Sequence, residues 1–369
     1  MFRRIIAQAR KELTQITRDW ITLTLALALP LFMLLLLSNS LSLTVTDLPL
    51  IVQDLDSSTA SRNYIDAFRG SLTFRVVAWP VDRQPEEALR SGQARAVLII
   101  PAHFSHNLAR GQATQVQLLI DATDANTAKL VNGYASQITR AYAQNNTGNN
   151  AGLMVTPEIR LWFNPGRNSQ KFYAPGMFVL GISMFPPLLA SLAMAKEGEQ
   201  KTILQVYVSN ISAHEFLLGK ILAFMLIAMM EWVVSVSVLL TVFGLHLTGD
   251  PSVFVVATVL YAFCVSAFGT MIGAAIPNQS AAIQAVALGG FLLVFLLSGL
   301  LFPVENIPAG LRWISSIIWG RYYIEIVRDA LLKGGGWPAM WFNVLMIAAI
   351  GAVFYTVAWR TMRRMQVNA

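Results

Sequence analysis

The sequence predicts an α-helical integral membrane protein with about six transmembrane helices and an α/β domain inserted between the first two. Of its 369 residues, 55% are hydrophobic and only 13% are charged, whereas soluble domains carry about 25% charged residues. The apolar residues form long runs, which is the pattern of membrane spans and not of a soluble core. Lipid is therefore the expected solvent for much of the chain.

Residues 1–19 are expected to form an amphipathic elbow helix at the membrane surface. Arginine and lysine occupy its polar faces, and such a helix lies in the membrane interface. Two interpretations stay open, because the helix either helps to form a docking surface or only fixes orientation as a basic anchor. The apolar residues at helical spacing are Phe2, Ile5, Ile6, Ala9, Leu13 and Ile16.

Six runs are long enough to cross the hydrocarbon core, which takes about 20 residues in a helix. The first falls in residues 20–43 and exceeds the apolar core of a signal peptide, so we expect an uncleaved anchor. The other five fall in residues 173–360. The runs are Ile21–Leu41, Ala174–Ala195, Ile221–Phe243, Ser252–Ile276, Ala281–Phe302 and Pro338–Trp359.

The distribution of basic residues predicts that both termini are cytoplasmic. Five Arg and Lys residues precede the first span, and three arginines flank the start of the tail, residues 361–369. Basic residues accumulate on the cytoplasmic side of spanning helices. This orientation places residues 44–172 outside and Lys196–Lys220 inside. The basic flanks also explain the net charge of +7 without a nucleic-acid partner.

Residues 44–172 are expected to form an extracytoplasmic α/β domain, since four strand-like segments alternate with four helix-like ones. The helical segments are Thr59–Phe68, Pro85–Ser91, Pro101–Ala109 and Ala125–Tyr142. The strand segments are Leu48–Val52, Thr73–Ala78, Ala96–Ile100 and Val116–Ile120.

Two groups of side chains in this domain could bind a metal, but neither is expected to do so. Asp54 and Asp56 follow the first strand, where such side chains cap the next helix, although a metal site is the alternative. His103 and His106 lie three residues apart, but no cysteine or nearby acidic residue completes a zinc set. We predict no metal centre in the chain.

No catalytic motif is present in the sequence. The phosphate loop G-x-x-x-x-G-K-[ST] does not occur, and neither does the G-x-S-x-G or H-E-x-x-H pattern. The chain is therefore predicted not to be an enzyme, and to bind no cofactor itself.

Glu231 is the one charged residue within the six predicted spans. A carboxylate at that depth is costly to bury, so it should face a helix interface or a water-filled cavity. It is a candidate intramembrane functional carboxylate that contacts substrate or carries a proton. The alternative is a structural role in joining two helices.

The segment Lys196–Lys220 resembles the first cytoplasmic loop of type-2 ABC transporter permeases. Shorter motifs in the same order resemble the family over essentially the whole chain: Asp54–Ser57, Leu118–Asp121, Arg160–Pro165, Pro303–Pro308 and Arg321–Arg328. The sequence departs from the family at Gly198, where a basic residue is usual, at Lys201, where glycine is usual, and at Asn210, where proline is usual. The matching loop residues are Glu197, Glu199, Thr202, Gln205, Ser209, Gly219 and Lys220.

The resemblance implies a permease subunit of an ATP-driven exporter in a bacterial inner membrane. It implies a dimer with itself or a paralogous permease, external re-entrant helices in residues 303–336, and a cytoplasmic ATPase subunit that docks on the coupling loop 196–220 and binds ATP and Mg. A periplasmic adaptor protein is a further expected partner. The substrate class is a drug, a lipid or a similar amphiphile. The alternatives are a proton-coupled secondary transporter, and a membrane-anchored sensor or assembly factor with an external ligand-binding domain.

Overall fold

The structure is a computed structural model in which two compact units are recognised. One unit comprises Met1–Ser42 and Leu161–Ala369, and the other comprises Leu43–Arg160. The residues described are 1–40, 47–77, 79, 84–90, 93–112, 114–121, 125–146, 169–202, 211–300, 304 and 307–367.

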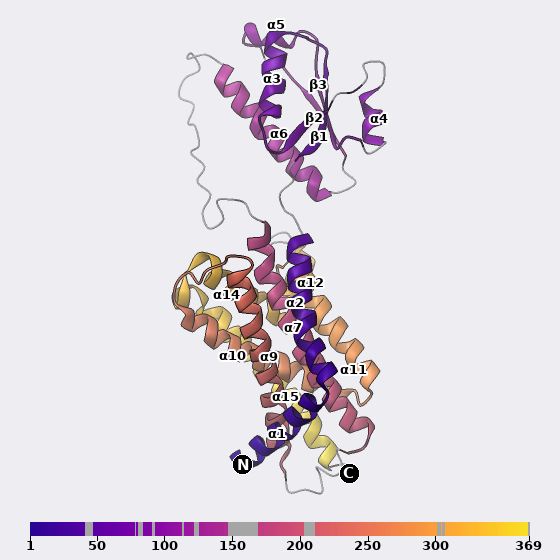
Figure 1. The fold of residues 1–369 in the computed structure, drawn as a ribbon, viewed down its shortest axis with the longest axis vertical. Helices are drawn as coiled ribbons and strands as arrows, with labels where there is room; N and C mark the ends of the chain where they lie inside the picture. Colours follow the sequence, from indigo (N-terminus) through magenta and orange to yellow (C-terminus); the bar gives the residue numbers. More distant parts are fainter. Residues whose placement is uncertain are drawn as a thin grey trace. The chain divides into compact units, whose positions relative to one another are not determined.

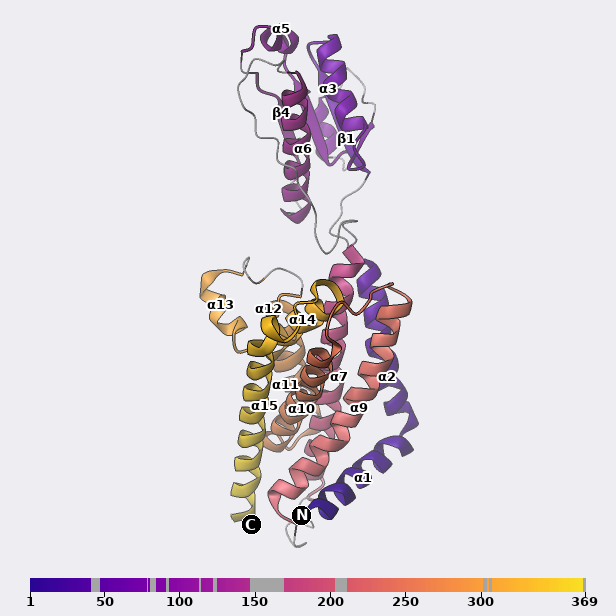
Figure 2. The same cartoon turned by 90° about the vertical axis from the view of Figure 1, so that its left-hand side faces the viewer.

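The first unit is a helical bundle whose two termini lie at the same end (Figures 1 and 2). It begins with α1 (Phe2–Arg18) and α2 (Trp20–Ser40), as the apolar patterns predict. The chain re-enters the bundle through α7 (Ser169–Glu199). The bundle continues with α9 (Ala213–Thr241), α10 (Pro251–Ala275), α11 (Gln279–Val286), η1 (Ala287–Leu292), α12 (Leu293–Leu297), α13 (Ala309–Ser315), α14 (Trp319–Arg328), η3 (Asp329–Lys333) and α15 (Gly336–Val367).

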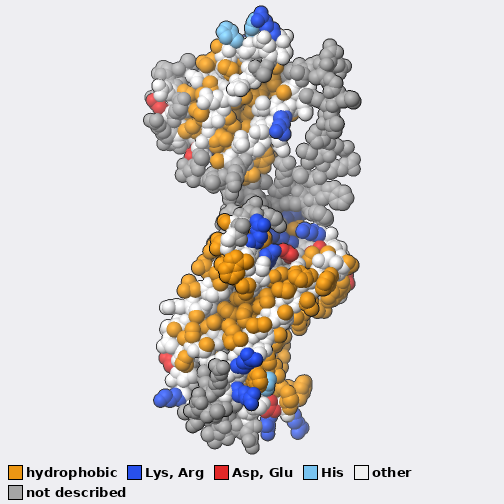
Figure 3. Space-filling model, turned by 180° about the vertical axis from the view of Figure 1, so that it is seen from behind, with side chains coloured by type: hydrophobic (Ala, Val, Ile, Leu, Met, Phe, Trp, Pro, Cys, Tyr) orange, Lys and Arg blue, Asp and Glu red, His pale blue; other side chains and the backbone are white. Residues whose placement is uncertain are grey.

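Among the described residues, six helical segments are long and apolar enough to cross a membrane. Hydrophobic side chains cover the middle of the bundle in Figure 3, and Lys and Arg gather toward its ends. This distribution is typical of a protein whose middle section lies in the hydrocarbon core of a membrane. The segments are Trp20–Ser40, Gln170–Glu199, Ala213–Thr241, Pro251–Ala275, Gln279–Leu297 and Gly336–Arg363.

Helices α7 and α10 form the centre of the bundle. The most apolar windows of these two helices are 78% and 72% buried, whereas those of α2, α11–α12 and α15 are each 22% buried. Tyr261 of α10 stacks on Tyr323 of α14 with ring centroids 4.0 Å apart, and its hydroxyl bonds Ser183 of α7. The three outer elements therefore present apolar faces that the bundle itself leaves uncovered.

The fifth span is shorter than the expected run Ala281–Phe302. Its helix is interrupted by the π-helical segment η1 and ends at Leu297. Gly290 allows close approach there, since a Cβ at this position would lie 2.9 Å from the Phe268 ring. Gly299 has φ of 86°, the left-handed conformation in which helices commonly end. These glycines account for the difference, because the apolar pattern continues past them.

The second unit contains a four-stranded sheet in the order β2-β1-β3-β4. Strand β1 (Leu48–Asp54) runs parallel to β2 (Phe74–Val77) and β3 (Ala96–Ile100), and β4 (Gln117–Ile120) is antiparallel to β3. All four strands occur where the alternation predicts them. The helices of this unit are α3 (Thr59–Arg69), α4 (Pro85–Arg90), α5 (Phe104–Ala109) and α6 (Ala125–Asn146).

The sheet has apolar side chains on both faces, which explains the near-continuous apolar strands. One face packs Leu50 and Leu98 against Tyr64 and Phe68 of α3, and Val131 of α6 joins them. The other face packs Ile51 and Val97 against Ala88 of α4. Helix α5 begins three residues later than the predicted Pro101, because His103 has φ of 69° and stands outside the helix as its N-cap.

Candidate functional site

Helix α1 packs directly on α9, and Gly219 is the point of closest approach. A Cβ at residue 219 would lie 2.6 Å from Cβ of Gln8 and 3.0 Å from the carbonyl oxygen of Ile5. Only a residue without a side chain permits this contact. The contact brings the polar face of α1 onto the start of the third span.

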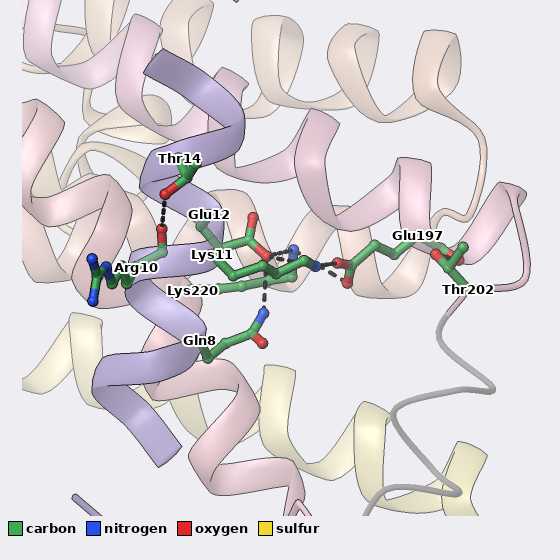
Figure 4. A network of polar contacts seen from close by, with 8 residues as sticks. All are labelled: Gln8, Arg10, Lys11, Glu12, Thr14, Glu197, Thr202 and Lys220. Atoms are coloured by element: carbon green, nitrogen blue, oxygen red, sulfur yellow. Dashed lines mark hydrogen bonds and ion pairs between the residues drawn. The ribbon is translucent and has the colours of Figure 1, made fainter. Parts of the chain in front are cut away.

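Four charged side chains meet where α1, α7 and α9 come together, and we call them the charged cluster: Lys11, Glu12, Glu197 and Lys220. Figure 4 shows them converging from the three helices. Lys220 has no exposed side-chain surface, and its Nζ lies 3.0 Å from Oε1 of Glu12 and 3.2 Å from Oε2 of Glu197. Lys11 completes the cluster, with Nζ 2.6 Å from Oε1 of Glu197 and 3.2 Å from Oε1 of Glu12.

The charged cluster is balanced, with two ammonium groups and two carboxylates. Gln8 also donates from Nε2 to Oε1 of Glu12 at 2.9 Å. Burial lowers the pKa of Lys11, but the carboxylates of Glu12 and Glu197 raise it by more, so the pKa lies above its ordinary value. Breaking a buried ion pair by removing one partner is strongly destabilising, because the other charge is left without compensation.

The start of α9 is tied to the start of α1 by a second set of contacts. Ser212 and Glu215 form a capping box, in which Ser212 accepts from the Glu215 amide and Glu215 accepts from the Ser212 amide. Glu215 also lies 3.4 Å from the amino terminus of Met1 and 3.5 Å from Nη1 of Arg4. Helix α1 is thus fixed to α9 at both ends of their contact.

The end of α7 is held by the turn that follows α10. Glu199 Oε2 accepts hydrogen bonds from the backbone amide and the side-chain amide of Gln279, at 3.2 and 2.9 Å. Gly198 lies against Pro277, where a Cβ would be 2.9 Å from the proline Cβ. This contact explains why a basic residue is absent at position 198.

Lys201 has φ of 55°, so it adopts the left-handed conformation directly after α7. Glycine reaches this region without steric cost, which gives a physical reason for the glycine usual in the family. Thr202 follows, and its hydroxyl donates to the backbone carbonyl of Glu197 at 3.3 Å. Lys201 thus adopts the backbone conformation that glycine favours.

The structure brings only part of the predicted loop site together. Glu197 and Thr202 lie at the charged cluster, whereas Glu199 makes its contacts with Gln279. Gln205 and Ser209 lie outside the described residues, as does Asn210.

The α1 half of the cluster does not follow from the sequence alone. The pattern of residues 1–19 predicts an amphipathic helix that contains Gln8 and Glu12, with Lys11 in its basic flank. One signal was available, because Glu12 is the only acidic residue in α1 and lies one turn from Gln8, beside the apolar stripe.

Glu231 lies where α9 crosses α2 and α7. The residue is 2% exposed, and neither carboxylate oxygen has a hydrogen-bond partner in the part of the chain that the structure describes. A Cβ on Gly181 of α7 would lie 3.0 Å from Glu231 Oε1 and 3.1 Å from Cβ of Pro30 in α2. A glycine and a proline therefore border this carboxylate in the middle of three spans.

Asp54 and Asp56 of the α/β unit accept hydrogen bonds from backbone amides. Asp54 accepts from the amides of Asp56 and Ser57, each at 3.0 Å, and Asp56 accepts from the Ser105 amide in the first turn of α5. Ser58 caps α3. No group of three metal-ligating side chains occurs among the described residues.

Two further acidic residues, Asp121 and Asp124, follow β4. Asp121 forms an ion pair with Arg95, at 2.5 Å between Oδ2 and Nη1. Asp124 lies outside the described residues.

The chain is a multi-pass membrane protein, as its six candidate spans and the apolar surface in the middle of the bundle indicate. The ABC-2 family transporter protein model matches residues 19–360, so the chain belongs to the ABC-2 transporter family. The resemblance of the chain to type-2 ABC transporter permeases is confirmed. The family comprises the membrane subunits of ABC transporters, and no enzyme family is indicated.

Three Escherichia coli K12 proteins are similar to this chain. "Probable multidrug ABC transporter permease YbhS" is 27% identical over 75% of both chains. "Probable multidrug ABC transporter permease YbhR" is 25% identical over 97% of this chain and 98% of its own length. "Inner membrane transport permease YhhJ" is 24% identical over 84% and 83% of the two chains.

Proposed function

We propose that this chain is the membrane subunit of an ATP-driven exporter in a bacterial inner membrane, working with a separate ATPase subunit that binds ATP and Mg. In this proposal both termini and residues 196–220 are cytoplasmic, and the α/β unit is extracytoplasmic. The basic flanks of the first and last spans support the orientation. The absence of a phosphate-loop motif from the sequence supports a motor on another chain.

The charged cluster carries the proposal. Glu197 and Lys220 belong to the two ends of the coupling loop, and they are joined to each other and to α1 by buried ion pairs. A force applied to the loop therefore acts on the ends of α7 and α9 together. ATP-driven closure of an ATPase pair would be transmitted in this way, as a rigid-body rearrangement of packed helices.

The proposed cargo is a drug, a lipid or a similar amphiphile. Two similar proteins are named multidrug permeases, which supports this class. Pairing with a second copy or a paralogous permease is part of the proposal, and the sparsely buried spans α2, α11–α12 and α15 offer surfaces for it. A periplasmic adaptor protein is the remaining proposed partner.

Substitutions at the loop test the ATPase partnership. We expect Glu199→Gln and Thr202→Ala each to reduce either co-purification of the ATPase or its substrate-stimulated ATP hydrolysis by about 10-fold. A loss of this size corresponds to one or two weakened polar contacts. Asp250→Asn is the matched control, because Asp250 accepts two hydrogen bonds from Ser252 at the far end of α9 and α10. Unchanged coupling in both loop variants, with both folded in the membrane, would oppose the proposal.

Glu231 favours a second candidate, a proton-coupled secondary transporter. Its buried and unpartnered carboxylate is the kind of group that carries protons in transporters. This candidate predicts export that persists without any ATPase and fails in Glu231→Gln. For the ATP-driven exporter, we expect export to stop when the ATPase is removed and to survive in Glu231→Gln at a rate within about 10-fold of wild type, because the amide keeps the shape of the carboxyl.

A further inference from the structure

A groove with a volume of about 670 Å³ lies between α1, α2, α7 and α9, directly beside the charged cluster. Its size is within the range of about 300 to 1,000 Å³ that ligand sites occupy. One part of its lining is apolar and comes from three helices: Ile16, Leu189, Leu192, Ala193 and Phe224.

Most charges around the groove are already satisfied. Lys11, Glu12 and Glu197 belong to the balanced charged cluster. Asp19 accepts from the amide and the hydroxyl of Thr22, at 3.1 and 2.6 Å. These bonds, and more weakly the charge of Lys196, lower the pKa of Asp19.

Two cations of the lining, Arg18 and Lys196, stand outside the charged cluster, and the charge of Lys196 acts on Asp19 from a distance. Among the described residues, no hydrogen bond or ion pair within 4 Å involves either side chain. Gln15 and Gln200 line the groove as well and carry amide donors. The polar part of the groove thus offers two positive charges and two neutral donors beside the carboxylate of Asp19, next to an apolar floor.

The groove also lies at the depth of lipid headgroups. Arg18 lies two residues before the first residue of the span Trp20–Ser40, and Lys196 lies in the last turn of the span Gln170–Glu199. Trp20 is 68% exposed, as expected for an aromatic residue at the membrane interface. A ligand in this groove would have its polar part at the interface and its apolar part in the hydrocarbon.

We propose that the groove binds an anionic phospholipid from the leaflet in which α1 lies. The phosphate contacts Arg18 and Lys196, and one acyl chain lies along the floor formed by Leu189, Ala193 and Phe224. Charge complementarity supports this occupant, because Lys11 and Lys220 balance Glu12 and Glu197, and the two cations Arg18 and Lys196 then outnumber the one carboxylate of Asp19. The bound lipid joins α1 to the end of α7, beside the coupling loop.

Phosphatidylglycerol binding to the purified full-length chain tests the proposal, with occupancy followed by native mass spectrometry. We expect the double variant Arg18→Gln/Lys196→Gln to bind about 10- to 30-fold more weakly, as the loss of two basic contacts implies. The matched control is Arg3→Gln/Arg10→Gln, which removes the same charge from α1 outside the groove. Arg10 points away from the charged cluster in Figure 4, and the control should bind like wild type.

Two further arms separate a lipid from other occupants. Ala193→Trp fills the floor without changing charge and should weaken phosphatidylglycerol binding, whereas inorganic phosphate should not displace the lipid. Equal binding by the groove and control variants would overturn the proposal, and so would displacement by phosphate alone. If Arg18→Gln/Lys196→Gln binds lipid normally but no longer associates with the ATPase, the groove is a docking surface for the ATPase and not a lipid site. The lipid-binding measurement itself needs no ATPase, so a negative result there leaves the proposed export function intact.

Discussion

Replacing Lys220 with methionine is expected to lower the stability of the helical unit by about 3–5 kcal/mol. The substitution leaves Glu12, which is 2% exposed, without its buried partner. Lys11 is 44% exposed and does not compensate fully. For a unit of this size, the loss corresponds to a fall of roughly 10 °C in the thermal melting midpoint of the detergent-solubilised protein.

Two companion variants show whether burial of the charge causes the loss. Lys11→Met removes the partly exposed ammonium group of the same cluster, so its effect should be about 1 kcal/mol or less. Adding Glu12→Gln to Lys220→Met should recover part of the loss, because the unpaired carboxylate is then neutral. Equal effects of the two lysine substitutions would contradict the assignment of Lys220 as the buried centre.

Gly219→Val is expected to separate α1 from α9. Its Cβ would lie within 3.0 Å of Gln8 and of the Ile5 carbonyl, and backbone must move to relieve the contact. Overpacking of this kind costs about 1–3 kcal/mol. Because the movement also draws Glu12 away from Lys220, we expect ATPase stimulation to fall by at least about 10-fold, which the loss of a single well-formed contact already produces.

Gly310→Val is the matched control for this substitution. Gly310 lies in α13, and a Cβ there meets no atom within 4 Å. ATP hydrolysis by the reconstituted complex and the melting midpoint should both stay close to wild type. If ATP hydrolysis and the melting midpoint fall equally in the two variants, a β-branched residue alone disturbs the bundle. The α1–α9 contact would then have no special role in coupling.

Local patterns were sufficient to predict the six spans and the helices and strands of the α/β unit, whereas the helices of residues 303–336 were expected only from the family resemblance. The spans follow from apolar runs that need no partner to be recognised, and β3 at Ala96–Ile100 occurs at its predicted bounds. The interruption of the fifth span was not predictable, because Gly290 is fitted to Phe268 on another helix. Apolar periodicity reports which face is buried and not what approaches it.

The candidate site was predictable only where the family loop provides a motif. Glu197 and Lys220 match that loop, but Glu12 meets Lys220 across 208 positions of sequence. No spacing rule relates residues so far apart. Conversely, the departures from the family at Gly198 and Lys201 are explained only by the structure. Gly198 lies against Pro277, and Lys201 has a positive φ.

Site-directed cross-linking tests most directly whether the coupling loop contacts an ATPase. The single cysteine, Cys264, is buried, so a Cys264→Ser background allows one new thiol to be placed at a chosen position. We expect Lys201→Cys to cross-link to the nucleotide-binding subunit of the proposed complex, with a yield that changes on ATP addition. Leu72→Cys, at a 90% exposed position of the α/β unit, should give no such product. Cross-linking from residue 72 and none from residue 201 would contradict the proposed docking site.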